Sequence, residues 1–170
     1  DTAARVARML SIYVRELSRE YPAQEPPVDA TPKDLEAWAI TLSPIRPDME
    51  KAARSLGRLQ RIDGHDIVRG DIDLRQANLQ GFDLESSTFE TVLFQGAQMQ
   101  GADLTGAQMQ GANLRFAKMQ GADLRGAKMQ GAFLTGAKMD ENTDLTAATL
   151  RGAAVRSVDD TTIAQLRDFW

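Results

Sequence analysis

The chain has no cysteine and a single histidine, His65, among its 170 residues. Disulfides and thiolate metal sites are therefore excluded, and the lack of cysteine favours a cytoplasmic protein. No apolar run approaches the roughly 20 residues that span a bilayer, and no segment resembles a signal peptide. The sequence also lacks a phosphate-cradling Gly-Lys-Ser/Thr loop and a carboxylate–histidine metal spacing. We expect no catalytic residues, no metal site and no cofactor, and we interpret His65 as structural.

The charge and the first residue add two constraints. The net charge of −4 is small, so direct binding of nucleic acid is not expected. The sequence begins with Asp1 rather than methionine, which is consistent with a piece of a longer protein.

A five-residue repeat dominates residues 71–158. The centre of each unit is Leu, Met or Phe, and the centres are Leu74, Leu79, Leu84, Phe89, Phe94, Met99, Leu104, Met109, Leu114, Met119, Leu124, Met129, Leu134 and Met139. The residue two positions before each centre is small or apolar, and glycine follows most centres by two positions. Self-similarity over so long a stretch predicts a stacked repeat architecture.

The five-residue period restricts the backbone. A continuous strand alternates its side chains with period two, so an odd repeat would turn every second centre outward. A helix is opposed because residues five apart rotate by roughly 500° and because glycine recurs. Short strands such as residues 102–104, ends inward and middle outward, joined by corners such as residues 105–106, satisfy the spacing. The sequence therefore predicts a coil whose turns stack roughly 4.8 Å apart.

Two units written out as Ala102-Asp103-Leu104-Thr105-Gly106 and Ala122-Asp123-Leu124-Arg125-Gly126 show the pattern. They resemble the pentapeptide-repeat proteins, whose repeat is Ala-(Asp/Asn)-Leu-x-x, and the resemblance covers about half the chain. It implies a mainly β fold, a right-handed quadrilateral β-helix with four units per coil. Residues twenty apart would then stack on one face.

Helices are predicted on both sides of the repeat. Helical spacing predicts an amphipathic helix over 1–21, and a proline-marked linker leads to helices near 32–42 and 47–60. Asp159 and Asp160 can begin a C-terminal helix with Ile163, Leu166, Phe169 and Trp170 as its apolar residues. We predict an α-helical region with a Pro-rich linker (1–61), the β-helix (62–158) and a capping helix (159–170). The apolar face of the first helix is predicted to consist of Val6, Met9, Leu10, Tyr13, Val14 and Leu17.

The repeat is irregular at both ends. Ile62 and Ile67 extend the inner column backwards from Ile72, so an imperfect half-coil, sealed by the preceding helix, is expected there. Residues 140–143 add one residue and move the later centres to Leu145, Leu150 and Val155.

The helical region resembles, less specifically, the region before the repeats in some bacterial membrane-tethered pentapeptide-repeat proteins. The similar stretches are Ser11-Ile12-Tyr13-Val14-Arg15-Glu16 and Arg46-Pro47-Asp48-Met49-Glu50-Lys51-Ala52-Ala53. In that group the membrane spans lie upstream, which implies tethering to the inner membrane in a longer parent protein.

One predicted face carries an acidic stripe, Asp83, Asp103 and Asp123. Pentapeptide-repeat proteins that protect DNA gyrase are thought to imitate DNA phosphates, so a DNA mimic that binds a type II topoisomerase is one hypothesis. The alternative is that aspartate merely follows the repeat pattern. The ten acidic and eight basic residues of 71–158 nearly balance and give little long-range field, which favours the alternative.

The opposite face carries apolar residues in outward positions. Leu93 and Phe133 are predicted to stack in one outward column, and Phe116 replaces the corner glycine of its unit. Such a patch suggests a contact, either with a helix of the same chain or with a partner. We predict a non-catalytic scaffold or protein–protein interaction module, with a homodimer through the C-terminal helix or the apolar face as one form of that contact.

Overall fold

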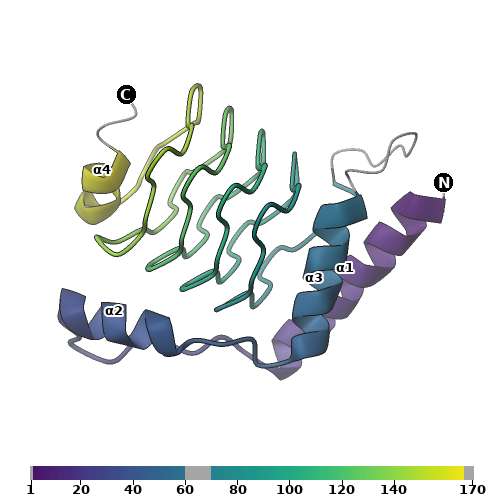
Figure 1. Ribbon diagram of the computed structural model, residues 1–170, viewed down its shortest axis with the longest axis horizontal. Coiled ribbons are helices and arrows are strands. Elements are labelled where there is room, and N and C mark those ends of the chain that lie inside the picture. The colour runs from purple at the N-terminus through teal and green to yellow at the C-terminus, as the bar shows by residue number, and fades with distance from the viewer. Residues whose placement is uncertain (1, 60–69, 167–170) are drawn as a thin grey trace.

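The computed structural model describes residues 2–59 and 70–166 (Figure 1). Three helices precede the repeats, α1 (Thr2–Glu20), α2 (Pro32–Thr41) and α3 (Pro47–Leu59), and α4 (Asp160–Leu166) follows them. The helices predicted near 32–42 and 47–60 are confirmed. The predicted half-coil over residues 62–69, with His65, and the apolar residues Phe169 and Trp170 lie outside the described residues.

The repeats stack as a coil with a step of twenty residues. Parallel backbone bridges join the middle residue of each unit to the residue twenty positions later, as from Leu93 to Asn113. Each bridge is isolated, because a corner interrupts the extended backbone after three residues. Beyond the extra residue in 140–143 the step becomes twenty-one, as from Asp123 to Asp144. Four units therefore make one turn, and the predicted change of register is confirmed.

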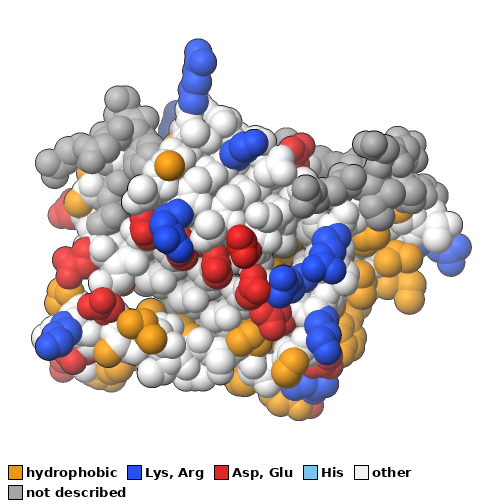
Figure 2. All heavy atoms as spheres, viewed as in Figure 1, with side chains coloured by type: hydrophobic (Ala, Val, Ile, Leu, Met, Phe, Trp, Pro, Cys, Tyr) orange, Lys and Arg blue, Asp and Glu red, His pale blue; other side chains and the backbone are white. Residues whose placement is uncertain are grey.

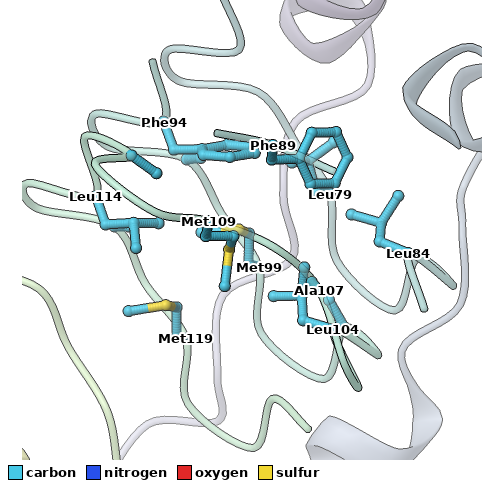
Figure 3. Packing of buried hydrophobic residues seen from close by; sticks show 14 of the residues in the cluster. Leu79, Leu84, Phe89, Phe94, Met99, Leu104, Ala107, Met109, Leu114 and Met119 are labelled. Atoms are coloured by element: carbon cyan, nitrogen blue, oxygen red, sulfur yellow. The ribbon is translucent and has the colours of Figure 1, made fainter. Parts of the chain in front are cut away.

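The interior of the coil consists of the predicted centres and the residues two positions before them. Every centre from Leu74 to Met139 is at most 2% exposed. Figure 3 shows the centres from Leu79 to Met119 pointing toward one another, and the rings of Phe89 and Phe94 meet edge to face with centroids 5.3 Å apart. Burying each large centre contributes roughly 1.5–3 kcal/mol, so the predicted division into inward and outward positions explains what stabilises the coil.

Helices α1 and α3 lie together across the first described turn (Figure 1). Inside the coil, the N–H of a middle residue donates to a carbonyl of the preceding turn, as from Gln98 to Ala77 at 2.9 Å. In the first described turn the four middle N–H groups donate to the helices instead. The pairs are Asp73 with Ser11 Oγ (3.2 Å), Asn78 with Ser18 Oγ (2.9 Å), Asp83 with Glu50 Oε1 (2.8 Å) and Thr88 with the carbonyl oxygen of Gly57 (3.0 Å). The two helices thus satisfy backbone groups that a further turn would otherwise satisfy.

Half of the residues predicted for the apolar face of α1 are buried: Val14 is fully buried, and Leu10 and Leu17 are partly buried against the core. The most buried residues of α1 are Ala3, Ala4, Ala7, Ser11, Val14 and Ser18. Val6, Met9 and Tyr13 are exposed instead. Small residues are required on the inner face because the two serine hydroxyls must come within hydrogen-bond distance of the coil backbone. The prediction followed hydrophobicity alone, so it included three exposed residues and missed the small residues of the buried face.

Residues 21–42, here called the strap, run along one side of the coil and include α2. The strap contacts successive turns through Tyr21 O with Asn78 Nδ2 (3.1 Å), Gln24 N with Gln80 Oε1 (2.7 Å), Glu25 with Lys118 (3.5 Å) and Pro32 O with Asn142 Nδ2 (3.2 Å). A Cβ at Gly101 would lie 2.6 Å from the carbonyl oxygen of Ala39. The corner glycine therefore allows the close approach of the strap as well as the positive φ of the corner.

Helix α4 packs at the opposite end of the coil. Its N-terminus is capped by Asp159, whose carboxylate accepts a hydrogen bond from the N–H of Thr162 at 2.8 Å. The Thr162 hydroxyl in turn accepts the N–H of Met139 at 2.9 Å, and Leu166 is buried. Over residues 2–59 and 70–166 no helix combines the length and the apolar character needed to cross a bilayer.

Candidate protein-binding face

The apolar face is the side of the coil formed by the middle residues Asp73, Leu93, Asn113 and Phe133. Backbone bridges join these four residues in one column, so the structure brings Leu93 and Phe133 together as the sequence predicted. They lie two turns apart, roughly 10 Å, and each is half-buried. Asn113 between them is buried, and its side-chain oxygen accepts the N–H of Arg115 at 3.4 Å. The column therefore presents two large apolar side chains with a buried, hydrogen-bonded asparagine between them.

Phe116 stands at a corner beside this column. Its side chain is 64% exposed, and its φ is +58°, in the left-handed region where neighbouring corners have glycine. A Cβ at Gly136 would lie 2.5 Å from Cδ1 of Phe116, so the ring lies against the glycine corner of the next turn. A non-glycine residue in this conformation costs of order 1–2 kcal/mol. The coil would be less strained with glycine at this position.

Arg115 is a member of the face that sequence reasoning missed. Its guanidinium carbon lies 5.1 Å from the centroid of the Phe133 ring, a cation–π geometry. The signal was present in the sequence, because a corner residue of one turn lies beside the middle residue of the next turn eighteen positions later. The face is therefore cationic as well as apolar at this end.

At the other end of the face, the carboxylate of Asp73 is paired with two arginines. Asp73 accepts hydrogen bonds from Arg15 of α1 at 2.6 Å and from Arg75 at 2.7 Å. Burial raises the pKa of Asp73, but the hydrogen bonds from Arg75 and the charge of Arg15 outweigh this effect and lower the pKa overall. Helix α1 thus contacts the apolar face at Asp73, the first residue of the column. The strap runs along the neighbouring side of the coil, where it contacts Asn78 and Lys118.

The acidic stripe, Asp83, Asp103 and Asp123, also forms one column. Each carboxylate accepts the N–H two residues ahead, as Asp103 does from Thr105 at 2.9 Å. This Asx turn fixes the corner and gives a structural reason for aspartate at the position. Figure 2 shows acidic side chains in a row across the coil, with Lys and Arg side chains at the ends of the row.

Two members of the acidic stripe are paired with arginine. Arg54 of α3 lies 2.8 Å from Asp83, and Arg125 lies 2.5 Å from Asp123. The hydrogen bond from Arg125 lowers the pKa of Asp123. These neighbouring cations reduce the negative potential that the stripe presents to a partner. In the described residues no group of three or more His, Asp or Glu side chains could hold a metal ion.

Comparison with known proteins identifies the repeat. The family model for pentapeptide repeats matches residues 72–111 and 107–141. The pentapeptide-repeat protein Rfr23 from the cyanobacterium Cyanothece 51142 is 32% identical over 56% of this chain and 68% of its own, with a TM-score of 0.27. A pentapeptide-repeat protein from Nostoc PCC 7120 is 26% identical over 55% of this chain and 79% of its own, also with a TM-score of 0.27.

QnrB1, a plasmid-mediated fluoroquinolone resistance protein, is 20% identical over 52% of this chain, with a TM-score of 0.40. The matched part spans 40% of the QnrB1 chain. A search of curated proteins found no match.

Proposed function

Because the chain belongs to the pentapeptide-repeat family, we propose that it is a non-catalytic scaffold that binds a protein partner through the apolar face and Phe116. The observation that carries this proposal is Phe116, a large, 64% exposed side chain in a conformation that favours glycine. The coil itself gains little from the ring at that corner. A contact with a partner outside the coil gives a physical reason for an exposed phenylalanine at this strained corner.

The chemistry of the face indicates the kind of partner. Leu93 and Phe133 offer apolar contact, and Arg115 over the Phe133 ring offers a guanidinium that can pair with a carboxylate. Aromatic and arginine side chains are enriched at the centres of protein interfaces. We expect a partner segment with apolar side chains and an acidic residue close to them.

In this proposal the coil is a right-handed quadrilateral β-helix, and its role is to hold the face rigid. The twenty-residue step of the bridges supports four flat sides. A rigid side presents its residues without an ordering cost on binding. An experimental crystal structure of the chain would determine the handedness.

The test compares proteins retained from a lysate of the source cells by the chain and by two variants. Leu93→Asn/Phe133→Asn changes the apolar face, and Gln108→Asn/Lys128→Asn is the matched control on another side of the coil. Both pairs place asparagine at middle positions, where Asn78 and Asn113 already occur. A partner that is lost with the first variant and kept with the second supports the proposal. Equal recovery with both variants contradicts it.

A topoisomerase-directed DNA mimic acting through the acidic stripe is the second candidate. The column of Asp83, Asp103 and Asp123 supports it, while the pairing of two of these carboxylates with arginine opposes it. A DNA gyrase supercoiling assay separates the two functions. The mimic alters supercoiling at stoichiometric protein, and Asp103→Asn weakens that effect, whereas a scaffold acting through the apolar face leaves supercoiling unchanged.

A further inference from the structure

Helix α1 carries a second apolar patch, on the side turned away from the coil. Nine large apolar side chains are exposed in the described part of the chain, and four of them lie on this one helix. They are Val6 (38%), Met9 (68%), Ile12 (57%) and Tyr13 (40%). Figure 2 shows hydrophobic side chains gathered over α1. Single exposed apolar residues need no explanation, but a cluster of four within eight residues indicates a contact.

This patch cannot turn inward, because the coil occupies the other side of the helix. Ser11 and Ser18 face the coil and accept its N–H groups. Tyr13 is held on the outside by its hydroxyl, which donates to Asp48 of α3. The inner face is therefore committed to the coil, and the outer patch is available to a contact of its own.

Charges of opposite sign flank the patch along the helix. Arg5 lies one turn before Met9, and Glu16 lies one turn after Ile12. At 100° per residue, these four residues fall within about 60° of one another around the helix. All four are exposed. Along the helix the order is cation, apolar, apolar, anion, with its midpoint between Met9 and Ile12. Glu16 also pairs with Arg19 of the same helix at 2.5 Å, so a contact with a second copy shares or replaces this exposed ion pair.

We propose that this face pairs with a second copy of the chain, α1 against α1 in antiparallel orientation. A two-fold axis at the midpoint places Met9 opposite Ile12 of the second copy and Arg5 opposite Glu16 of the second copy. The same contacts recur on the other side of the axis, as an isologous interface requires. Each end of the helix pair then joins unlike charges, and the centre is apolar. Parallel pairing would place like charges against each other.

An anionic membrane surface is the competing occupant of this face. Glu16 and Glu20 would be repelled by anionic lipid, whereas the exposed Arg5, Arg8 and Arg19 of the same helix would be attracted to it. The self-complementary order of the charges favours a second copy of the chain.

Charge reversal tests the pairing directly. Sedimentation velocity over a range of protein concentrations should show a reversible dimer of the intact chain. Arg5→Glu alone places like charges at both ends of the helix pair, and so does Glu16→Arg alone, so each should weaken dimerisation about tenfold or more. An equimolar mixture of these two variants should recover the dimer, because every end pair is again unlike. Lys128→Glu, on a distant side of the coil, is the matched control and should dimerise like the original chain.

Cross-linking tests the orientation, and the absence of native cysteine makes it simple. Under mild oxidation, Met9→Cys protein mixed with Ile12→Cys protein should form the mixed disulfide in preference to either homodisulfide. A preference for homodisulfides would overturn the antiparallel arrangement. A chain that stays monomeric at all concentrations, or a mixture of charge variants that does not recover the dimer, would overturn the proposal. So would a monomer that sediments with phosphatidylserine vesicles in a manner dependent on Met9 and Ile12.

Discussion

The hydroxyl of Ser18 in α1 accepts a hydrogen bond from the backbone N–H of Asn78 in the first described turn of the coil, at 2.9 Å. The same hydroxyl donates to the carbonyl of Val14, one helical turn earlier, at 2.7 Å. It therefore connects the backbone of the helix to the backbone of the coil. Ser11, seven residues earlier on the same face, has the same two roles toward Ala7 and Asp73.

Ser18→Ala should destabilise the protein by about 1–3 kcal/mol, because it leaves the buried N–H of Asn78 without an acceptor. Ser55→Ala is the matched control, since Ser55 also donates to a carbonyl four residues earlier but is exposed on α3. Urea unfolding measures both free energies. Equal losses for the two variants would contradict the role given to Ser18.

Gly57→Ala should destabilise the protein although alanine favours helices. A Cβ at this position would lie 2.6 Å from Cβ of Ser87, and α3 cannot move away without losing the hydrogen bond from Thr88 to the Gly57 carbonyl. Helix propensity offers up to about 1 kcal/mol, whereas overpacking typically costs 1–3 kcal/mol. Packing should therefore prevail. Adding Ser87→Gly should recover part of the loss in a double-mutant cycle, and additive losses would rule out this contact as the cause.

Ala122→Leu and Asp103→Asn test the two sides of one repeat. Ala122 is fully buried, so leucine should overpack the coil and cost about 1–3 kcal/mol or more. Asparagine at 103 keeps the oxygen that accepts the N–H of Thr105 and should be nearly neutral. Equal melting temperatures for the two variants would refute the assignment of inward and outward positions.

Much of the coil could be predicted from the sequence, because a period of five leaves few backbone solutions. The centres and the register change after residues 140–143 follow from counting along the chain. The outward column of Leu93 and Phe133 also required the four units per coil that the family resemblance implies. Such counting works because each unit contacts mainly its neighbours in the stack.

The contacts between the helices and the coil could not be predicted in this way. The side of α1 that faces the coil is determined by the hydroxyls of Ser11 and Ser18, which accept hydrogen bonds from backbone N–H groups of the first turn. Apolar periodicity contains no information about those N–H groups, so it placed the exposed Met9 and Tyr13 on the same face as the buried Val14. The strap likewise depends on the close approach of its backbone to Gly81 and Gly101, and nothing in the linker itself specifies a side of the coil.

Acid should loosen the contact between α1 and α3 through Asp48. Hydrogen bonds from Arg46 and Tyr13 lower the pKa of this carboxyl to about 2. A pKa below the unfolded value of about 3.9 means that the stabilisation is complete above that value and is lost as the pH falls toward 2. Asp48→Asn should lower the melting temperature near neutral pH and reduce its further fall between about pH 4 and pH 2. An unchanged acid dependence would show that Asp48 does not contribute to it.

Phe116→Gly tests the apolar face most directly, because the melting temperature should rise while the recovery of the partner should fall. Glycine removes the strain of φ +58° and an exposed ring, so the melting temperature should rise by a few degrees, equivalent to about 1 kcal/mol. Recovery of the partner that is lost with Leu93→Asn/Phe133→Asn should fall with Phe116→Gly as well, and this loss could not be attributed to unfolding. A variant that is more stable and retains the partner at the level of the original chain would contradict a binding role for Phe116 and the apolar face.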